Sequence, residues 1–178
     1  EVVSMLVAIT GTPGVGKSTV SSILRRTYRV IDIHSYAEEH DLFEEFDDDA
    51  GSYDVDVEKL NESVMSEDME GTVFIDGHLS HFIDVDLIIV LRCDPRVIHD
   101  RLKARGYDDK KIDENVQTEI LDVILYESVE SGIPTYEIDC THLTPEEVAS
   151  KMISILNGDA DGTEPGTVNW SDRMDEWF

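Results

Sequence analysis

Short runs of apolar, mostly β-branched residues alternate along the chain with longer segments in which apolar side chains recur every three or four positions. The short runs are typical of buried strands, and the longer segments are typical of amphipathic helices. The pattern predicts strands over residues 5–10, 28–34, 72–76, 86–91 and 134–139. It predicts helices over residues 19–26, 35–46, 55–69, 95–105, 113–131 and 145–156.

Local signals support several of these boundaries. Pro95 suits the first turn of a helix, and Gly132 is typical of the residue that follows a helix end. Thr144 and Glu147 stand at the spacing of a capping box, with a proline between them at the first helical position. A charged loop is expected over residues 47–52 and a polar link over residues 108–112.

Strands that alternate with helices favour an α/β fold, in which a parallel sheet lies between two layers of helices. Residues 1–157 are expected to form this single domain, and residues 158–178 an acidic C-terminal tail. The tail could be disordered, but Trp170 and Trp177 argue that part of it packs on the body or on a partner.

Charge is the unusual feature of the composition: 40 acidic residues face 14 basic ones, a formal net charge of −26. Such a surface repels nucleic acid, so direct sequence-specific binding of nucleic acid is not expected. One interpretation is a halophilic protein, adapted to a high-salt cytoplasm in which ions screen the self-repulsion. The alternative is a site for a basic partner, above all over residues 32–70, which carry 16 of the acidic residues. The two interpretations are compatible.

The cysteines and the hydropathy indicate a cytoplasmic location. Cys93 and Cys140 lack the spacing of a metal site and lie in or beside predicted strands, so buried free thiols are expected. No stretch approaches the ~18 apolar residues of a membrane helix. The N-terminus has no basic region, so no signal peptide is expected.

The segment from Gly11 to Thr19 has the sequence Gly-Thr-Pro-Gly-Val-Gly-Lys-Ser-Thr, which fits the P-loop pattern G-x-x-x-x-G-K-[ST]. Because it lies between a predicted strand and a predicted helix, its backbone N–H groups would line a concavity that binds an anion. Lys17 is expected to reach the β- and γ-phosphates of a nucleotide, and the Ser18 hydroxyl to bind Mg²⁺.

Other polar residues also end predicted strands. Asp32, Asp76 and Arg92 do so and are expected to face one crevice with the P-loop. Asp76 has the position of a carboxylate that holds Mg²⁺, although a strand-end acid can also simply cap a turn. His78 could orient an attacking water or contact the γ-phosphate, or it could be a solvated loop residue. His81 is a much weaker candidate.

Basic residues cluster late in the chain. Lys59 is the only one between Val30 and Leu91, and seven then follow within twenty residues: Arg92, Arg96, Arg101, Lys103, Arg105, Lys110 and Lys111. We interpret the cluster as charge neutralisation on a phosphoryl group in transfer, with Arg105 on a closing flap. The alternative is a solvated helix face with cations near the helix C-terminus.

Together these motifs resemble the adenylate kinase-like NTPases called coilin-interacting nuclear ATPases, whose archaeal members are described as adenylate kinases and ribosome-maturation factors. The resemblance covers roughly residues 5–155. It rests on the P-loop, on Asp76-Gly77-His78, and on Arg101-Leu102, Arg105-Gly106-Tyr107, Lys111-Ile112, Glu114-Asn115-Val116-Gln117 and Glu119-Ile120.

The resemblance implies a P-loop NMP-kinase-like fold with a five-stranded core, an NMP-binding insertion at about 32–55 and a short lid at about 105–115. It implies transfer of the ATP γ-phosphoryl group to AMP, ATP hydrolysis, and a role in late maturation (rRNA processing) of the small ribosomal subunit with a small-subunit ribosomal protein. It implies that ATP is bound by Gly14, Gly16, Lys17, Ser18, Thr19 and Arg105. It assigns Asp76 and His78 to Mg²⁺ and the hydrolytic water.

One departure from this family divides the functional hypotheses. Kinases of this fold usually hold the acceptor phosphate with an arginine of the insertion, but residues 32–55 contain none, and residues 37–40 are acidic where it would be expected. The lid is also too short for the zinc or paired-arginine arrangements of larger adenylate kinases. The chain is therefore either an NMP kinase with ATPase activity, or an ATPase switch that binds and releases a basic ribosomal protein or the pre-ribosomal small subunit. A non-enzymatic binding module is disfavoured because Lys17, Ser18 and Asp76 are all present.

We predict that the fold loosens in dilute buffer and recovers in molar KCl, because salt screens the repulsion among the acidic side chains. Circular dichroism across a salt series checks this expectation. Full secondary structure in salt-free buffer would contradict adaptation to high salt.

Overall fold

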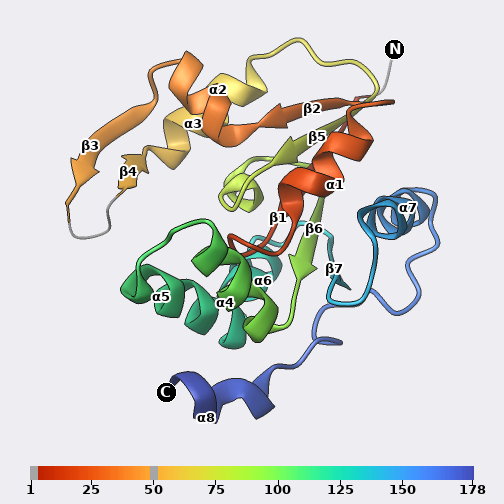
Figure 1. Ribbon diagram of the computed structural model, residues 1–178. Coiled ribbons are helices and arrows are strands. Elements are labelled where there is room, and N and C mark those ends of the chain that lie inside the picture. Colours follow the sequence, from red (N-terminus) through yellow and green to blue (C-terminus); the bar gives the residue numbers. More distant parts are fainter. Residues whose placement is uncertain (1–3, 49–51) are drawn as a thin grey trace.

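The computed structural model describes residues 4–48 and 52–178 of the chain. Five strands form one parallel sheet in the order β2-β5-β1-β6-β7 (Figure 1). Their bounds are β1 Met5–Thr10, β2 Arg29–Asp32, β5 Thr72–Asp76, β6 Leu87–Arg92 and β7 Thr135–Asp139. The predicted α/β fold with a five-stranded parallel sheet is confirmed, and β1, which leads into the P-loop, lies at its centre.

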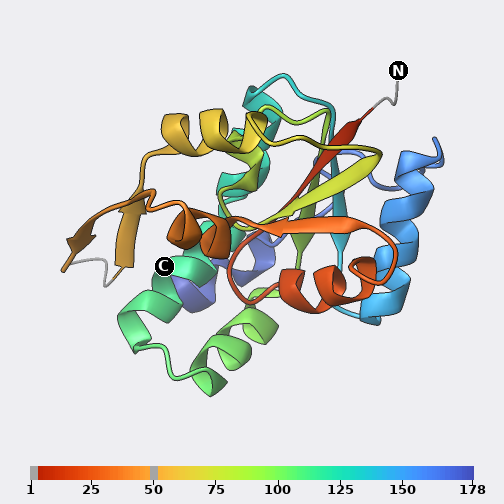
Figure 2. The ribbon, with the colours of Figure 1, turned by 90° about the horizontal axis from the view of Figure 1, so that it is seen from above.

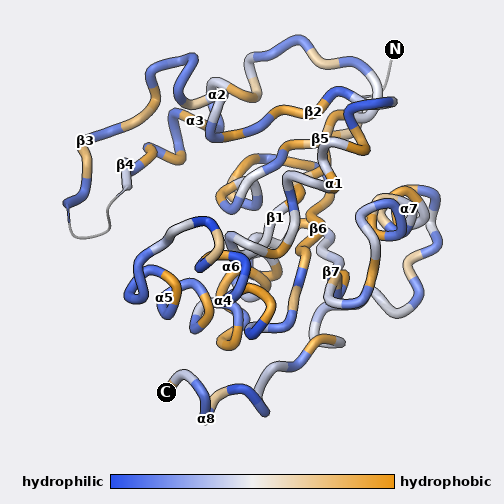
Figure 3. The backbone as a smooth tube through the Cα atoms, viewed as in Figure 1, coloured by the Kyte–Doolittle hydropathy of each residue, from blue (hydrophilic) through white to orange (hydrophobic). Residues whose placement is uncertain are grey.

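Alternating side chains of each strand build two separate cores, one on each face of the sheet. Val7 and Ile9 pack with α1 (Lys17–Leu24), α4 (Pro95–Ala104), α5 (Asp109–Ile120) and α7 (Pro145–Leu156). Leu6 and Ala8 pack with α2 (Ile33–Glu39), α3 (Val57–Met65) and α6 (Val123–Glu130). Figure 3 shows the hydrophobic residues concentrated in the strands of the sheet. This two-sided burial explains why the strands are continuous apolar runs.

The expected helix over residues 35–46 is wrong in its second half. Asp32 caps α2 by accepting a hydrogen bond from the Ser35 N–H at 2.8 Å, so the helix begins at Ile33, which had been assigned to a strand. Residues 43–47 instead form β3 (Phe43–Asp47), which pairs with β4 (Ser52–Val55) in an antiparallel hairpin. This hairpin stands away from the sheet in Figure 2. Residues 49–51 of the expected charged loop lie outside the described residues.

Two further predicted elements, in the second half of the chain, differ from expectation. The polar link is mostly helical, because Asp108 accepts a hydrogen bond from the Lys111 N–H at 2.9 Å and starts α5 at Asp109. The long helix predicted over residues 113–131 is two helices. The chain breaks between them at Asp122, whose φ of 55° is left-handed, and the Asp122 carboxylate contacts Arg92.

Arg92 does not face the crevice, contrary to the sequence prediction. Its side chain is 1% exposed and lies inside the fold. It donates to Glu119 Oε1 at 2.8 Å, to Glu137 Oε2 at 3.0 Å, and to Asp122. Burial alone would lower the pKa of Arg92, but Glu119 and Asp122 hold it above its ordinary value. The arginine is therefore a structural cation that joins β6, α5 and β7.

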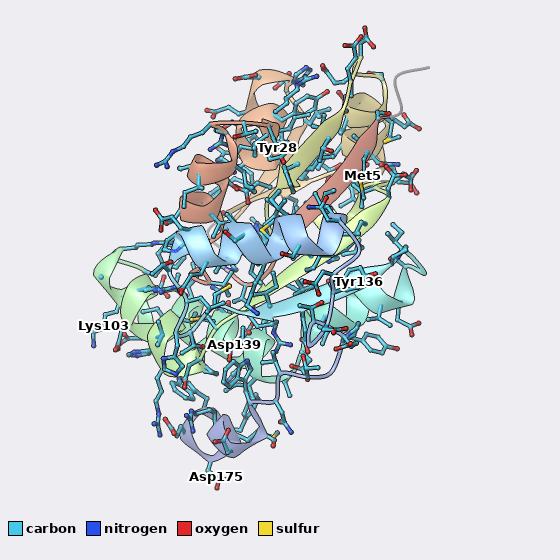
Figure 4. The ribbon with its side chains drawn as sticks, turned by 90° about the vertical axis from the view of Figure 1, so that its right-hand side faces the viewer. Met5, Tyr28, Lys103, Tyr136, Asp139 and Asp175 are labelled. Carbon is cyan, nitrogen blue, oxygen red and sulfur yellow. The ribbon has the colours of Figure 1, made fainter. Side chains whose placement is uncertain are left out.

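The C-terminal tail packs on the body, as the two tryptophans suggested. Trp170 is 9% exposed, and its indole N–H donates to Glu119 Oε1 at 3.2 Å. Val168 N–H and the Thr167 hydroxyl both donate to Glu137 Oε1. The tail ends in η2 (Ser171–Arg173) and α8 (Met174–Trp177). In Figure 4, Asp175 marks α8 at one end of the molecule, beyond the end of β7.

Other expectations of the sequence are met. Cys93 and Cys140 are buried free thiols, and burial raises their pKa values to about 11 and about 12. The capping box of Thr144 and Glu147 is present at the start of α7. Within residues 4–48 and 52–178, none of the helices combines the length and the apolar character that crossing a membrane requires.

We predict that Glu137→Ala destabilises the fold by about 3–5 kcal/mol. The substitution removes the carboxylate that accepts hydrogen bonds from Arg92, from the Thr167 hydroxyl and from the Val168 N–H, and these donors stay buried. Chemical denaturation in high salt measures the change. Glu130→Ala is the matched control, since Glu130 is exposed and its removal should cost less than about 0.5 kcal/mol. Equal stability of the two variants would contradict the structural role of Glu137.

Candidate functional site

The P-loop connects the central strand β1 to α1, and its glycines are required by geometry. A Cβ at Gly11 would lie 2.5 Å from the Leu91 carbonyl oxygen, and Gly16, which precedes α1, has a φ of 110°. Both positions exclude ordinary L-residues. Lys17 folds back over the loop and donates to the carbonyl oxygens of Gly11 at 2.5 Å and Thr12 at 3.1 Å. The loop therefore holds the lysine ammonium over its own concave face.

Thr12 and Glu119 form a contact that the sequence analysis missed. The Thr12 hydroxyl donates to Glu119 Oε2 at 2.7 Å, and both residues are buried. Glu119 is the same carboxylate that accepts from Arg92 and Trp170. One signal was available, because Glu119 lies on the apolar face of its helix between Val116 and Ile120.

The electrostatic surroundings of Lys17 make it an unusually weak base for a lysine. Burial against the loop lowers the pKa of Lys17 to about 8, although Asp76 and Glu119 oppose the shift, and Arg105 contributes to it. An anion in the concavity would stabilise the protonated form. A phosphate group that enters the site is therefore expected to cause Lys17 to bind a proton.

Asp76 lies at the end of β5, directly beside the P-loop strand. It is 2% exposed, and its Cα is paired in register with that of Asp32 on β2. Burial raises the pKa of Asp76, and the nearby Asp32 raises it further, against the effect of Lys17. Ser18 presents an exposed hydroxyl at the start of α1. Desolvated carboxylate and hydroxyl oxygens are the donors that Mg²⁺ prefers, so these residues fit that ion.

His78 follows Asp76 after Gly77 and is exposed to solvent. Partial loss of hydration lowers its pKa to about 4, and the charge of Lys17 lowers it further, with smaller effects of His81, His34 and Lys111. The imidazole is therefore neutral near pH 7. A neutral imidazole can accept a proton from water or donate a hydrogen bond to an oxygen.

The clustered basic residues of the segment 92–111 do not gather at one site, but lie in at least three separate places. Arg92 is internal, as described, and Arg96 pairs with Glu176 of the tail. Arg101 donates to the Gly14 carbonyl oxygen at 2.9 Å, and Arg105 ends α4 on the same side. Only part of the cluster therefore approaches the P-loop.

A cavity of about 220 Å³ opens beside Gly16 and Thr19. Arg101 and Arg105 line it from α4 and its C-cap, Leu143 lines it from the loop that follows β7, and Pro145 from the start of α7. Apolar side chains and guanidinium groups both offer faces for a flat ring. The sequence did not single out Leu143, and it pointed to Arg101 only as a member of the basic cluster.

His81, which the sequence disfavoured, is in fact buried. It contacts Thr10, the last residue of β1, and Glu127 of α6. The sequence held no signal for this, because the partners lie 71 and 46 residues away.

The residues gathered around the P-loop form an anion site with an adjoining ring-binding cavity. The loop and Lys17 supply positive potential, Asp76 and Ser18 supply oxygen ligands, and Arg105 lies at the exposed edge. This arrangement can bind a phosphate chain and stabilise negative charge that moves along it.

Comparisons of sequence agree with this description. The family model for the AAA domain matches residues 7–122. A protein of Methanocaldococcus jannaschii with the name "Putative adenylate kinase" is 43% identical over 98% of this chain and 97% of its own length. A protein of the same name from Archaeoglobus fulgidus is 41% identical over 98% of both chains.

Solved structures share the fold at low identity. Shikimate kinase from Bacteroides thetaiotaomicron has a TM-score of 0.57 at 18% identity, covering 86% of this chain and 98% of its own. Deoxyadenosine kinase from M. mycoides has a TM-score of 0.54 at 17% identity, covering 86% of this chain and 100% of its own. These similarities confirm the predicted P-loop, NMP-kinase-like fold.

We predict that ATP affinity falls roughly tenfold per pH unit above pH 8, because the free protein must then take up a proton at Lys17 to bind phosphate. Below pH 7 the ammonium is charged in both states, so this group contributes no pH dependence there. Calorimetry with a non-hydrolysable ATP analogue from pH 7 to 9 measures the slope and the proton uptake.

Lys17→Arg is the control for this titration, because arginine stays charged throughout the range. Its affinity should be lower but independent of pH. An unchanged affinity of the wild-type protein from pH 7 to 9 would refute the lowered pKa.

Proposed function

Since the chain belongs to the AAA domain family and to one family with these archaeal relatives, we propose that it transfers the γ-phosphoryl group of ATP to AMP or another nucleoside monophosphate. We propose in addition that it hydrolyses ATP when water takes the place of the acceptor. The names of the relatives support the first activity. The second rests on the position and neutrality of His78.

The observation that carries the proposal is the closeness of Lys17, at the start of α1, to Asp76, at the end of β5. β1 and β5 are neighbours in the sheet, and the charges of the two side chains influence each other's pKa values. A cation and a buried carboxylate at this place are the two groups that phosphoryl transfer needs for the phosphate chain and its metal ion.

Each site residue then has a role in the reaction. The backbone at Gly14 and Gly16 holds the triphosphate, with Thr19 beside it. Lys17 and Arg105 stabilise charge on the transferred group. The cavity beside Gly16 would take the adenine ring.

Ser18 and Asp76 would hold Mg²⁺, which when bound would supply positive charge that offsets the charge of the phosphates. Asp76 also repels a second carboxylate, Asp32, and a cation would relieve that repulsion. His78 lies on the acceptor side, where its neutral imidazole can orient a water or contact the γ-phosphate.

The second candidate function is an ATPase switch whose work is to bind and release a basic protein, with little kinase activity. One observation favours it: residues 32–55, which include α2, β3 and β4, contain no arginine or lysine. A small-subunit ribosomal protein and the pre-ribosomal small subunit are the partners proposed for it. In that case the acidic surface binds the partner, and ATP hydrolysis at the nucleotide site controls when the partner is released.

We expect ADP formation from ATP and Mg²⁺ in high salt to depend strongly on added AMP if the protein is a kinase, with ADP appearing twice as fast as AMP is consumed. A coupled assay with and without AMP separates the two functions. ADP formation that ignores AMP would count against a physiological kinase and favour the switch.

Two substitutions test the site itself. Lys17→Ala should abolish both transfer and hydrolysis, and Lys151→Ala, an exposed lysine of α7, should leave both unchanged. His78→Ala should reduce hydrolysis roughly a hundredfold while ATP binding changes less than threefold. Retained turnover in Lys17→Ala would refute the P-loop assignment, and equal losses of binding and hydrolysis would remove the catalytic role of His78.

A further inference from the structure

The turn that carries His78 is attached to the P-loop strand at two points. Gly77 N–H donates to the Ile9 carbonyl oxygen at 3.1 Å. The buried Ser80 hydroxyl contacts the carbonyl oxygens of Ile9 at 2.9 Å and Gly77 at 2.8 Å. Ser80 begins a short helix, η1 (Ser80–Phe82), so His78 is held between two residues that are fixed to the end of β1.

His81 extends this attachment in two directions. Its Nδ1 lies 2.8 Å from the hydroxyl of Thr10, the last residue before the P-loop glycine. Its Nε2 lies 2.8 Å from Glu127 Oε2 on α6. The ring is 2% exposed, whereas the Glu127 side chain is 38% exposed at the surface. The imidazole therefore connects a surface carboxylate to the base of the P-loop.

The proton positions along this chain follow from its two ends. Glu127, as a carboxylate, accepts the proton of Nε2, so that Nδ1 of a neutral ring accepts the Thr10 hydroxyl proton. That proton is then not available to the His78 carbonyl oxygen, which lies 3.4 Å from the Thr10 oxygen. Glu127 thus fixes the tautomer of His81, and the bond between His81 and Thr10 ties η1, which closely follows His78, to the end of β1.

We propose that His81 and Glu127 are positioning residues, which hold the Asp76-Gly77-His78 turn against the P-loop strand. The proposal deepens the proposed function, because it names groups outside the crevice on which His78 depends. Neither residue reaches the reacting atoms. Their effect is on where the His78 imidazole stands, and therefore on turnover more than on the binding of ATP.

Thr10→Val tests the chain without changing any charge, because valine keeps the shape of threonine and lacks the hydroxyl. We expect kcat to fall about tenfold while Kd for ATP changes less than twofold. Thr10→Ser restores the hydroxyl and should restore most of kcat. A wild-type kcat in Thr10→Val, or an equal loss in Thr10→Ser, would overturn the proposal.

His81→Gln, which keeps a partner for Glu127 and loses the contact at Nδ1, should lower kcat to a similar extent. In the double variant Thr10→Val/His81→Gln the loss should stay near tenfold, because both changes break the same chain. A multiplied loss of about a hundredfold would show independent effects and overturn the proposal. If His81→Gln fails to fold, Glu127→Gln, at a partly exposed site, replaces it and should lower kcat by at least threefold; no effect there would overturn the proposal.

A second measurement does not depend on turnover, so that failure of the proposed function can be distinguished. Native-state hydrogen exchange of the Gly77 N–H, which donates to the Ile9 carbonyl oxygen, reports how firmly the turn is held against β1. In Thr10→Val this exchange should become about tenfold faster, because the turn opens more often. His99→Gln, which removes a surface histidine in contact with Asp100, is the control and should leave the exchange rate unchanged. Identical exchange rates in wild type and Thr10→Val would overturn the positioning role even if no phosphoryl transfer were found.

Discussion

The buried ion network around Arg92 is the constraint on which the rest of the structure depends. A guanidinium enclosed by protein is tolerable only when carboxylates surround it, and here Glu119, Asp122 and Glu137 come from three different elements. Satisfying that one cation therefore fixes α5, the start of α6 and β7 relative to β6. The same carboxylates also bind the tail and, through Glu119 and Thr12, the P-loop.

The Glu119 carboxylate, which bonds to both Arg92 and Thr12, limits how the site can move. The expected lid includes the end of α4 and the first part of α5, and such segments usually close over bound nucleotide. The last turns of α5, however, are bonded to Arg92 and Thr12 through the Glu119 carboxylate. In addition, the Gln117 side chain of α5 donates a hydrogen bond to the Trp177 carbonyl oxygen of the tail. Closure of the predicted lid would therefore be confined to the turn over residues 105–108 and the first turn of α5. Arg105 lies in that turn, so the part left to move would carry the arginine for which we propose a phosphate contact.

The same network explains where sequence reasoning succeeded and failed. Strands, the P-loop and the capping box at Thr144 follow from local patterns, because burial on both faces and helix-terminal hydrogen bonds leave signals within a few residues. Arg92 looked like a phosphate ligand because it ends a strand, and its neutralising partners lie 27 to 45 residues away. The helix break at Asp122 was missed since apolar positions continue through it. The hairpin was missed because Phe43 and Phe46 are spaced as on a helix, while their ring contacts with Tyr53 form only across the turn.

The distribution of cations bears on which acceptor, a monophosphate or water, the proposed reaction would use. Of the seven clustered basic residues, Arg92 is enclosed by the core, Arg96 pairs with Glu176 of the tail, and Arg101 and Arg105 line the cavity beside Gly16. On the opposite side stand Asp32, His34 and His78, and the hairpin there adds carboxylates and the aromatic rings of Phe43 and Tyr53. Lys17 and Lys111 are cations whose charges reach His78, so a dianionic phosphate on that side would depend on them, on a metal ion or on a protonated histidine. Water would have no such requirement, so under the proposed function the choice between monophosphate and water depends on the positive charge near the acceptor.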